Sequence, residues 1–338
     1  MRIAMISPPW ERVPPPAYGG IEAVVGLLAD DLVRRGHEVT LYATGDSQTL
    51  ATLRSVCPES LRARGVENPQ SYTLVHASRA LAESGEFDLL HNHCGETLMA
   101  LASLAAAPML TTIHGPLPAD ARIVWDHYPG SYNTISQASK KELPDRRYLG
   151  VVYNGIDVDS FPFAPNKDDY LLFLGRISAE KGTHQAIEVA RRLGQRLLIA
   201  GKVDRVDREY FRDEVEPLID GGLIQYVGEA DGPTKRDLYA HARCLLHPVT
   251  WPEPFGLVMA EAMACGTPVI GTRLGSVPEV VSHGETGFVV DSLDEIVDAV
   301  HRLHEIDPGR CRERVATHFS VNRMVDGYER VYGEIVGS

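Results

Sequence analysis

Residues 253–268 read Glu-Pro-Phe-Gly-Leu-Val-Met-Ala-Glu-Ala-Met-Ala-Cys-Gly-Thr-Pro, and this stretch decides the fold. The apolar run at 245–249 predicts a short strand, and the prolines within 251–256 predict a loop. Residues 257–264 are good helix formers, and the closing Gly-Thr-Pro predicts the end of that helix. The order strand, loop, helix is typical of a parallel sheet covered by helices.

Two glutamates of this stretch, Glu253 and Glu261, fall on different local structures. Glu253 lies in the predicted loop. Glu261 lies among apolar residues of the predicted helix, where a carboxylate needs a partner to offset its desolvation. A helix start carries unpaired N–H groups and about half a positive charge, which favours a phosphate, and a carboxylate accepts hydrogen bonds from vicinal hydroxyls. We interpret the pair as holding the two sugars of a nucleotide sugar; the alternative is two ordinary surface glutamates.

Strand and helix signals alternate along the chain and restart once, which predicts two parallel sheets covered on both faces. In the first half we predict a helix at 21–34 and strands at 2–6, 38–43, 88–91, 109–113 and 132–135. In the second half we predict strands at 170–174, 196–200, 224–227, 244–248, 268–271 and 287–290. Further helices are predicted at 183–193, 210–219, 234–242, 277–282, 293–304 and 322–336.

The glycine and prolines of residues 154–166 predict a linker between the two series. We expect an N-terminal domain at 1–164, joined by the C-terminal helix 322–338, and a C-terminal domain at 165–321. Ligands of such sheets bind beyond the carboxyl ends of the strands, where two facing domains form a cleft. The functional motifs should therefore cluster there.

Composition excludes several classes of protein. A chain of 338 residues with 44% hydrophobic and 23% charged residues is globular and too long for one ordinary core. Its net charge of −13 argues against a nucleic-acid partner, and the cluster Lys140, Lys141, Arg146 and Arg147 is interpreted as a solvated face. Five cysteines without CxxC spacing predict reduced thiols in the cytoplasm and no zinc site. No apolar run approaches the roughly 18 residues of a membrane-spanning helix, so we expect a soluble protein.

Residues 175–182, Gly-Arg-Ile-Ser-Ala-Glu-Lys-Gly, directly follow the first predicted strand of the second domain. Arg176 and Lys181 lie on one turn between strand and helix, so both cations can reach a common point above the sheet. Arginine offers a planar fork to two phosphate oxygens, and lysine offers a compact charge. The pattern fits a diphosphate; two exposed surface cations are the alternative.

Gly19 and Gly20 precede the first predicted helix. They allow the backbone to approach a ligand closely, with the N–H groups of the helix behind it. The sequence between the first strand and these glycines is rich in proline and contains no GxGxxG, which argues against a dinucleotide-binding turn.

His114 follows a predicted first-domain strand and could donate a hydrogen bond to a sugar hydroxyl. A core histidine is one alternative. A metal site made by His91, His93 and His114 is another, although no carboxylate or cysteine completes a recognisable ligand spacing. Residues that could line an acceptor pocket, or could simply pack at strand ends, are Trp10, Tyr18, His93 and Trp125.

Together these motifs resemble those of the retaining nucleotide-sugar glycosyltransferases of family GT4. The resemblance covers nearly the whole chain. It rests on Glu253-x7-Glu261, the Gly-Arg-Ile-x-x-x-Lys-Gly turn, Asn154-Gly-Ile-Asp157, Gly19-Gly20 and Thr-Ile-His-Gly at 112–115, which occur in the family's order. It implies an α/β protein of the GT-B class, with two Rossmann-like domains facing across a cleft.

The resemblance also implies roles for individual residues. Arg176 and Lys181 would hold the diphosphate, which Gly19 and Gly20 would approach from the other domain. Glu261 would bind the ribose and Glu253 the transferred sugar, with His114 beside that sugar. The other implied donor-binding residues are Phe255, Gly256, Leu257 and Val258, through backbone N–H groups, and Val227 near the base.

The implied reaction is metal-independent, in agreement with the absence of an Asp-x-Asp run. We expect transfer of a hexosyl unit from a nucleotide sugar, most simply a UDP-sugar, to a hydroxyl on the face that the diphosphate leaves. A soluble acceptor is favoured over a lipid because the first domain lacks a basic amphipathic helix. The alternatives are a non-catalytic nucleotide-sugar-binding protein and a nucleotide-sugar epimerase. Neither the base, the sugar, the acceptor nor the oligomeric state is indicated by the sequence.

Overall fold

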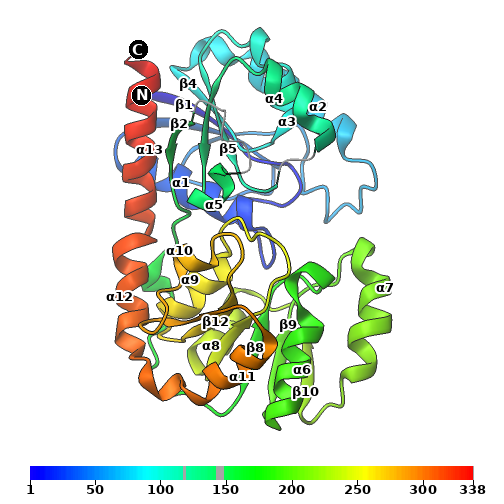
Figure 1. Ribbon diagram of the computed structural model, residues 1–338. Coiled ribbons are helices and arrows are strands. Elements are labelled where there is room, and N and C mark those ends of the chain that lie inside the picture. Colours follow the sequence, from blue (N-terminus) through cyan, green and yellow to red (C-terminus); the bar gives the residue numbers. More distant parts are fainter. Residues whose placement is uncertain (117–118, 142–147, 338) are drawn as a thin grey trace. The chain divides into compact units, whose positions relative to one another are not determined.

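The computed structural model describes residues 1–116, 119–141 and 148–337, and the chain divides into two compact units (Figure 1). Unit 1 comprises Met1–Gly155 and Val321–Ser338, and unit 2 comprises Ile156–Ser320. The C-terminal helix thus belongs to the same unit as the N-terminus. The division precedes the boundary expected at 164/165, and Arg146 and Arg147 of the basic cluster lie outside the described residues.

Within the described residues, unit 1 contains a seven-stranded parallel sheet in the order β3-β2-β1-β4-β5-β6-β7. Its central strands are almost completely buried because helices cover both faces. The strands are β1 (Arg2–Ile6), β2 (Glu38–Tyr42), β3 (Thr52–Arg54), β4 (Leu89–Asn92), β5 (Met109–Ile113), β6 (Ser131–Thr134) and β7 (Tyr148–Val151).

The helices of unit 1 form two groups (Figure 1). One group packs α1 (Gly20–Arg34) against α13 (Val321–Val336). The other shares a hydrophobic core with the sheet and contains α2 (Gln70–Ala82), α3 (Glu96–Ala100) and α4 (Arg122–His127); the short α5 (Gln137–Lys140) precedes β7. On α13, Tyr332 bonds to His91 of β4 (2.7 Å) and Tyr328 to Thr112 of β5 (3.2 Å). These buried bonds attach the last helix to the sheet.

Unit 2 contains, among its described residues, a six-stranded parallel sheet in the order β10-β9-β8-β11-β12-β13. Its strands are β8 (Leu171–Leu174), β9 (Leu197–Ala200), β10 (Ile224–Gly228), β11 (Cys244–His247), β12 (Val269–Thr272) and β13 (Gly287–Val290). The connections place α6 (Thr183–Leu193) and α11 (Leu293–His301) together on one face. The other face carries α8 (Gly232–His241), α9 (Leu257–Ala264) and α12 (Pro308–His318), and α10 (Val277–Val280) follows β12.

Helix α9 is the centre of unit 2. Met259, Ala260, Ala262, Met263 and Ala264 have no solvent exposure, as expected of a helix that is apolar on all sides. The two parallel sheets confirm the predicted α/β architecture, and the helix predicted at 183–193 is confirmed to the residue. The helix predicted after the proline loop, with its start near residue 255 or 256, is also present, and it spans Leu257–Ala264.

The helix predicted at 210–219 is present, but it is not a regular α-helix. The segment is divided into α7 (Arg208–Tyr210), a π-helical turn (Phe211–Val215) and a 3₁₀ turn (Glu216–Leu218). Pro217 explains the last break, because a proline lacks the N–H that would continue the helix and is tolerated only in the first turn of a new one.

Candidate active site

The order of the strands in unit 2 reverses between β8 and β11. In open parallel sheets, ligands bind at the carboxyl ends of the two strands that flank such a reversal. The loop after β8 carries Lys181 and the loop after β11 carries Glu253. The two strongest sequence motifs of this half therefore meet at the position where the topology favours a ligand.

Glycines allow three loops to pack tightly around Glu253. Gly182 has φ 75°, and a Cβ there would lie 2.0 Å from the carbonyl oxygen of Pro248. Gly275 has φ 56°, and a Cβ there would lie 2.3 Å from the backbone N and O of Glu253. The N–H of Ser276 donates to the carbonyl of Glu253 (2.8 Å). The main chain of Glu253 is thus fixed by the loop after β12, and Gly182 lets the loop after β8 approach Pro248.

Lys181 and Glu253 form a buried ion pair. Nζ of Lys181 donates to Oε2 of Glu253 at 2.5 Å, and the side chains are 18% and 6% exposed. Nε2 of His247 lies 3.4 Å from the same oxygen, close enough for electrostatic attraction but without a well-aligned hydrogen bond. Burial alone would raise the pKa of Glu253, but His247 and Lys181 together lower it to about 2. Glu253 is therefore an ionised acceptor at neutral pH.

The start of α9 lies beside this ion pair. Gly256 precedes the helix with φ 74°, and a Cβ there would lie 3.2 Å from Cγ of Glu253. The first N–H groups of a helix have no partner within it, so Leu257 and Val258 present donors at the positive end of the helix dipole. Phe255 itself is buried, and its ring packs on Phe319.

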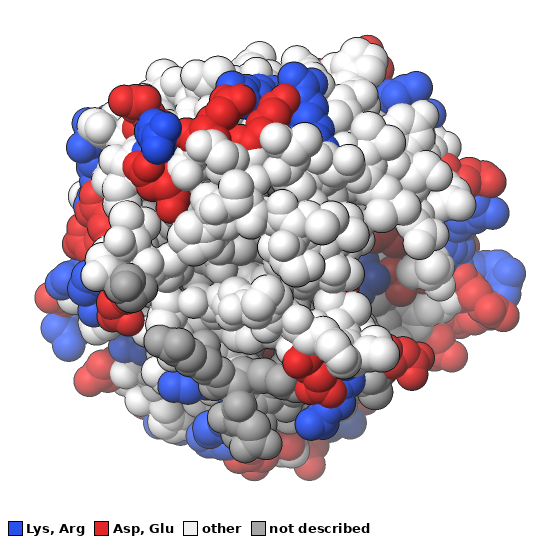
Figure 2. Space-filling view, turned by 90° about the horizontal axis from the view of Figure 1, so that it is seen from above, with Lys and Arg blue, Asp and Glu red and all other residues white. Residues whose placement is uncertain are grey.

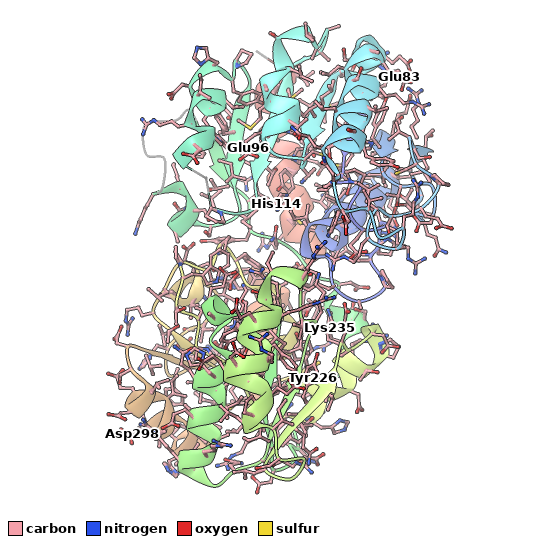
Figure 3. All side chains as sticks on the ribbon, turned by 90° about the vertical axis from the view of Figure 1, so that its right-hand side faces the viewer. Glu83, Glu96, His114, Tyr226, Lys235 and Asp298 are labelled. Atoms are coloured by element: carbon pink, nitrogen blue, oxygen red, sulfur yellow. The ribbon has the colours of Figure 1, made fainter. Side chains whose placement is uncertain are left out.

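Glu261 is also buried, and both of its oxygens have protein partners. Oε1 accepts from Nζ of Lys235 (2.7 Å) and Oε2 accepts from the hydroxyl of Tyr239 (2.9 Å). Lys235 and Tyr239 both come from α8, and Figure 3 shows Lys235 on this helix. These partners offset the desolvation of a carboxylate that is otherwise surrounded by apolar residues.

Arg176 lies on the same loop as Lys181 but has different neighbours. Its guanidinium donates to Glu180 and, at 3.3 Å, to Asp207 in the segment after β9. A diphosphate at this position would have to share or replace these carboxylates. Val227, at the end of the edge strand β10, is 46% exposed.

In unit 1, Gly19 and Gly20 lie where the sequence places them, at the start of α1. Gly19 has φ 146°, and a Cβ there would lie 2.8 Å from Cβ of Pro15, so only glycine fits. The strand order of this sheet reverses between β1 and β4, and the glycines follow β1 in the chain. They thus belong to the loop at the reversal point of the unit 1 sheet.

His114 follows β5 (Figure 3), and its Nε2 lies 2.7 Å from Nδ1 of His93, so one ring donates to the other. Burial lowers the pKa of His114 to about 4 and also lowers that of His93. His91 instead bonds to Tyr332 and Thr112. Within the ranges that the structure describes, no group of three or more His, Cys, Asp and Glu side chains is arranged to hold a metal ion.

The aromatic residues considered for an acceptor pocket separate into two sets. The rings of Trp10 and Tyr18 both pack against the guanidinium of Arg62, with centroids 5.3 Å and 5.8 Å away. Trp125 agrees with the packing alternative and not with a pocket. It is 3% exposed, stacks on Tyr132 and belongs to the hydrophobic core, because its helix packs onto the sheet.

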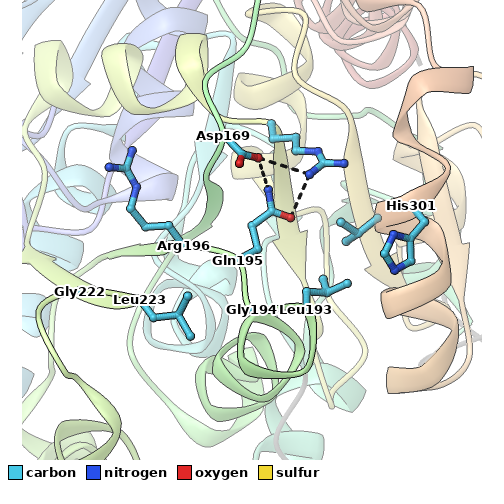
Figure 4. A pocket seen from close by; sticks show the side chains of 10 residues that line it. Asp169, Leu193, Gly194, Gln195, Arg196, Gly222, Leu223 and His301 are labelled. Atoms are coloured by element: carbon cyan, nitrogen blue, oxygen red, sulfur yellow. Dashed lines mark hydrogen bonds and ion pairs between the residues drawn. The ribbon is translucent and has the colours of Figure 1, made fainter.

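A pocket of about 500 Å³ in unit 2 is formed by segments that precede β8, β9, β10 and β11, so it lies at the opposite edge of the sheet (Figure 4). There Gln195 donates to Asp169 (2.6 Å) and accepts from Arg243 (3.0 Å). These bonds join the starts of three strands. None of the site residues predicted from the sequence lines this pocket.

Lys235, Tyr239, His247 and Trp251 were not predicted from the sequence. His247 could have been noticed as a polar residue that ends an apolar strand. Trp251 lies in the proline-containing loop at 251–256. Its ring centroid is 4.6 Å from Nζ of Lys181. Lys235 and Tyr239 give no local signal, because a lysine or tyrosine on a short helix is usually a surface residue.

Sequence models of two families match this chain. The family described as "Glycosyl transferases group 1" matches residues 157–316, and "Glycosyltransferase Family 4" matches residues 18–160. The chain belongs to the GT4-type glycosyltransferases. This glycosyltransferase is 27% identical to the uncharacterized glycosyltransferase MJ1607 of Methanocaldococcus jannaschii, over 90% of this chain and 89% of that protein.

A second relative of the glycosyltransferase is the phosphatidyl-myo-inositol mannosyltransferase of Mycobacterium tuberculosis, 27% identical over 100% of this chain and 98% of that protein. Among solved structures, Anabaena Alr3699/HepE in complex with UDP and glucose has a TM-score of 0.79 at 19% identity. The alignment covers 99% of this chain and 100% of that one. This likeness shows the GT-B fold, and the family assignment supports glycosyl transfer from nucleotide-sugar donors.

The described part of the glycosyltransferase includes no helix with both the length and the apolar character needed to cross a bilayer. In the view from above, basic and acidic side chains are interspersed around the rim of the face, and those that the structure describes do not form one basic region there (Figure 2).

Proposed function

We propose that this glycosyltransferase moves a hexosyl unit from a UDP-sugar to a hydroxyl of a soluble acceptor, with retention of configuration and without a metal ion. The buried Lys181–Glu253 ion pair beside the start of α9 carries the proposal, because it places a cation, an ionised carboxylate and free backbone donors at one point. The choice of uridine is supported by the similar structure that holds UDP and glucose.

Each group has a task in the proposal. Lys181, Arg176 and the N–H groups of Leu257 and Val258 bind the diphosphate and stabilise its charge as it leaves. Glu253 accepts hydrogen bonds from hydroxyls of the transferred sugar, since a carboxylate with a pKa of about 2 remains ionised.

Glu261 and Lys235 complete the donor site in this proposal. The carboxylate accepts from the ribose hydroxyls, and the ammonium that now bonds to it can donate to a ribose or base oxygen. His114, with its pKa lowered to about 4, is a neutral imidazole whose second ring nitrogen can accept one hydrogen bond from a sugar hydroxyl.

In the reaction, the bond between the anomeric carbon and the diphosphate oxygen breaks, and the acceptor oxygen bonds to the same carbon on the same face. The acceptor proton passes to the leaving phosphate oxygen. Cationic side chains and helix N–H groups then do what a divalent metal does in other transferases, which is to offset the charge that develops on the diphosphate.

A soluble acceptor is proposed although one relative is named for a phospholipid. The chain carries a net charge of −13, and an anionic membrane surface attracts clusters of basic residues.

The test is an incubation with UDP-, GDP-, ADP- and dTDP-sugars, with and without acceptors, followed by NMR. Transfer gives an acceptor-linked sugar whose anomeric coupling reports retention, whereas an epimerase gives a new nucleotide sugar and a binding protein gives neither. Lys181→Ala should abolish turnover, while Arg192→Ala, an exposed cation on α6, should not. Equal rates in both variants would contradict the assignment.

A further inference from the structure

A cluster on unit 1 joins two aromatic rings, one arginine and two buried acids. The guanidinium of Arg62 packs against the rings of both Trp10 and Tyr18. It also forms an ion pair with Glu11, whose N–H donates to Oε1 of Glu22 (3.3 Å). We call these five residues, Trp10, Glu11, Tyr18, Glu22 and Arg62, the Arg62 cluster.

The cluster is held in place by backbone bonds. The N–H of Arg62 donates to the carbonyl of Trp10 and that of Leu61 to the carbonyl of Pro9, both at 3.1 Å. The proline-rich loop after β1 is thereby joined to the segment after β3. The arrangement is therefore part of the fold and does not depend on long exposed side chains alone.

The cluster lies at the reversal point of the unit 1 sheet. Glu22 is in the first turn of α1, and its Oε2 lies 3.2 Å from where a Cβ of Gly19 would be. Loops after β1 and β4 are where a sheet of this order binds small molecules.

The charges of the cluster select the kind of molecule that fits. Glu11 and Glu22 are 6% and 5% exposed, so the single arginine faces two buried carboxyl groups. Burial raises the pKa of Glu22 to about 7, so at neutral pH the cluster carries between zero and one net negative charge. A phosphate or carboxylate would meet a cation that is already neutralised, and acids that repel it.

A neutral saccharide matches the same groups. Tyr18 is 40% exposed and offers a ring face on which the C–H surface of a sugar can pack. The side chain of Arg62 is 28% exposed and offers donors, while the acids offer acceptors. A sugar hydroxyl can donate one hydrogen bond and accept another, so it can bond to the arginine and to an acid at the same time.

We propose that the Arg62 cluster binds the acceptor of this transferase and that this acceptor is a neutral saccharide, not a phosphorylated or acidic one. The proposal rests on the function proposed above and adds the class of acceptor and the residues that select it. Glu11 has the deciding role, because its charge keeps Arg62 from serving as an anion site.

The experiment compares neutral disaccharides (maltose, cellobiose, mannobiose) with anionic acceptors (glucose 6-phosphate, glucuronate) on the full chain with its best UDP-sugar. Transfer and acceptor-independent release of UDP are measured together. Wild type should prefer neutral acceptors in kcat/KM by at least about tenfold. Tyr18→Ala should raise the acceptor KM by about tenfold relative to the donor KM. Arg64→Ala, a nearby cation packed on Tyr72, is the matched control and should leave the preference unchanged.

Glu11→Gln is the decisive variant because it keeps the size and shape of the side chain at position 11 and removes its charge. We expect it to shift the preference toward anionic acceptors by about tenfold, since the side chain paired with Arg62 then no longer carries a charge that repels them. A structural role for Glu11 would lower the use of all acceptors alike.

Three results are informative. Wild-type preference for anionic acceptors, or a preference unmoved by both Tyr18→Ala and Glu11→Gln, would overturn the inference while leaving the proposed function intact. Should Glu11→Gln not fold, the effect of Tyr18→Ala on the acceptor KM decides alone. Absence of both UDP release and nucleotide-sugar binding in wild type would instead remove the proposed function, and the inference with it.

Discussion

Replacing Lys181 by methionine should leave Glu253 as a buried carboxylate without its ammonium partner. Methionine keeps the length of the side chain and its packing against Trp251, so the variant removes mainly the charge. Glu253 would keep only His247, whose Nε2 is 3.4 Å away. A buried charge that loses its partner cannot be compensated by water as a surface charge can.

Two independent considerations give the loss of unfolding free energy expected in Lys181→Met. Removing one partner of a buried ion pair costs about 3–5 kcal/mol. The pKa of Glu253 is about 2, against an ordinary value of about 4.3, and a shift of about two units corresponds to about 3 kcal/mol. Lys181 shares this shift with His247, which favours the low end of the range for a buried ion pair. We therefore expect Lys181→Met to lower the free energy of unfolding by about 3 kcal/mol at pH 7.

The pH dependence has a definite sign. Because the folded pKa of Glu253 is lower than the unfolded one, its contribution to stability is present above about pH 4.3 and is lost as the pH falls toward 2. In Lys181→Met burial dominates, and the pKa of Glu253 rises. The difference in stability between wild type and variant should therefore become smaller as the pH falls from 7 to 4.

Urea unfolding of Lys181→Met, Glu253→Gln and the double variant measures the interaction directly. We expect an interaction energy of at least about 2 kcal/mol, with the double variant more stable than Lys181→Met. Arg192→Met, whose side chain is 42% exposed, is the control and should cost less than about 0.5 kcal/mol. If the two single effects add to within about 0.5 kcal/mol, the electrostatic explanation is wrong.

Three further outcomes are expected. Gly182→Ala should lower the free energy of unfolding by at least about 1 kcal/mol and weaken UDP binding. The reason is that a Cβ at φ 75° would lie 2.0 Å from the carbonyl oxygen of Pro248. Urea unfolding checks the first effect and UDP titration the second. His114, with a folded pKa of about 4, should stabilise the protein fully above about pH 6.5 and progressively less as the pH falls toward 4, and NMR titration of its ring should show no inflection between pH 5 and 8. Transfer should continue after dialysis against EDTA, and a loss restored by Mg²⁺ would contradict the metal-independent mechanism.

Much of the fold could be predicted because its signals are local. Prolines and glycines mark the loops around 251–256 and the end of α9, and short apolar runs mark the buried strands. Two of the elements that were missed, β3 and α2, have weak signals. Strand β3 has three residues, and α2 follows a proline and has little amphipathic character. For α12, Asp307 and Pro308 form a helix start that the sequence analysis overlooked.

The site could be predicted only in part. A sequence motif identifies one residue of a contact, but not the residue elsewhere in the chain that the fold brings against it. Glu261 in an apolar helix requires a partner, but nothing near it in the sequence identifies Lys235, which comes from α8. For the same reason Arg62 gives no signal beside Trp10, since the segment after β3 reaches the loop after β1 only through the fold. Trp125 shows the converse: an aromatic residue beside a strand can belong wholly to the core.

The ion pair at Glu253 also determines what this carboxylate can do in a reaction. A group with a pKa of about 2 cannot act as a general acid at neutral pH, and the oxygen that bonds to Lys181 is already occupied. Its remaining capacity is to accept hydrogen bonds from hydroxyls. A diphosphate that binds Lys181 would compete with Glu253 for the ammonium and make that oxygen available as the donor arrives. The ion pair thus compensates both charges. In the proposed reaction, the exchange of partners would couple recognition of the diphosphate to recognition of the sugar.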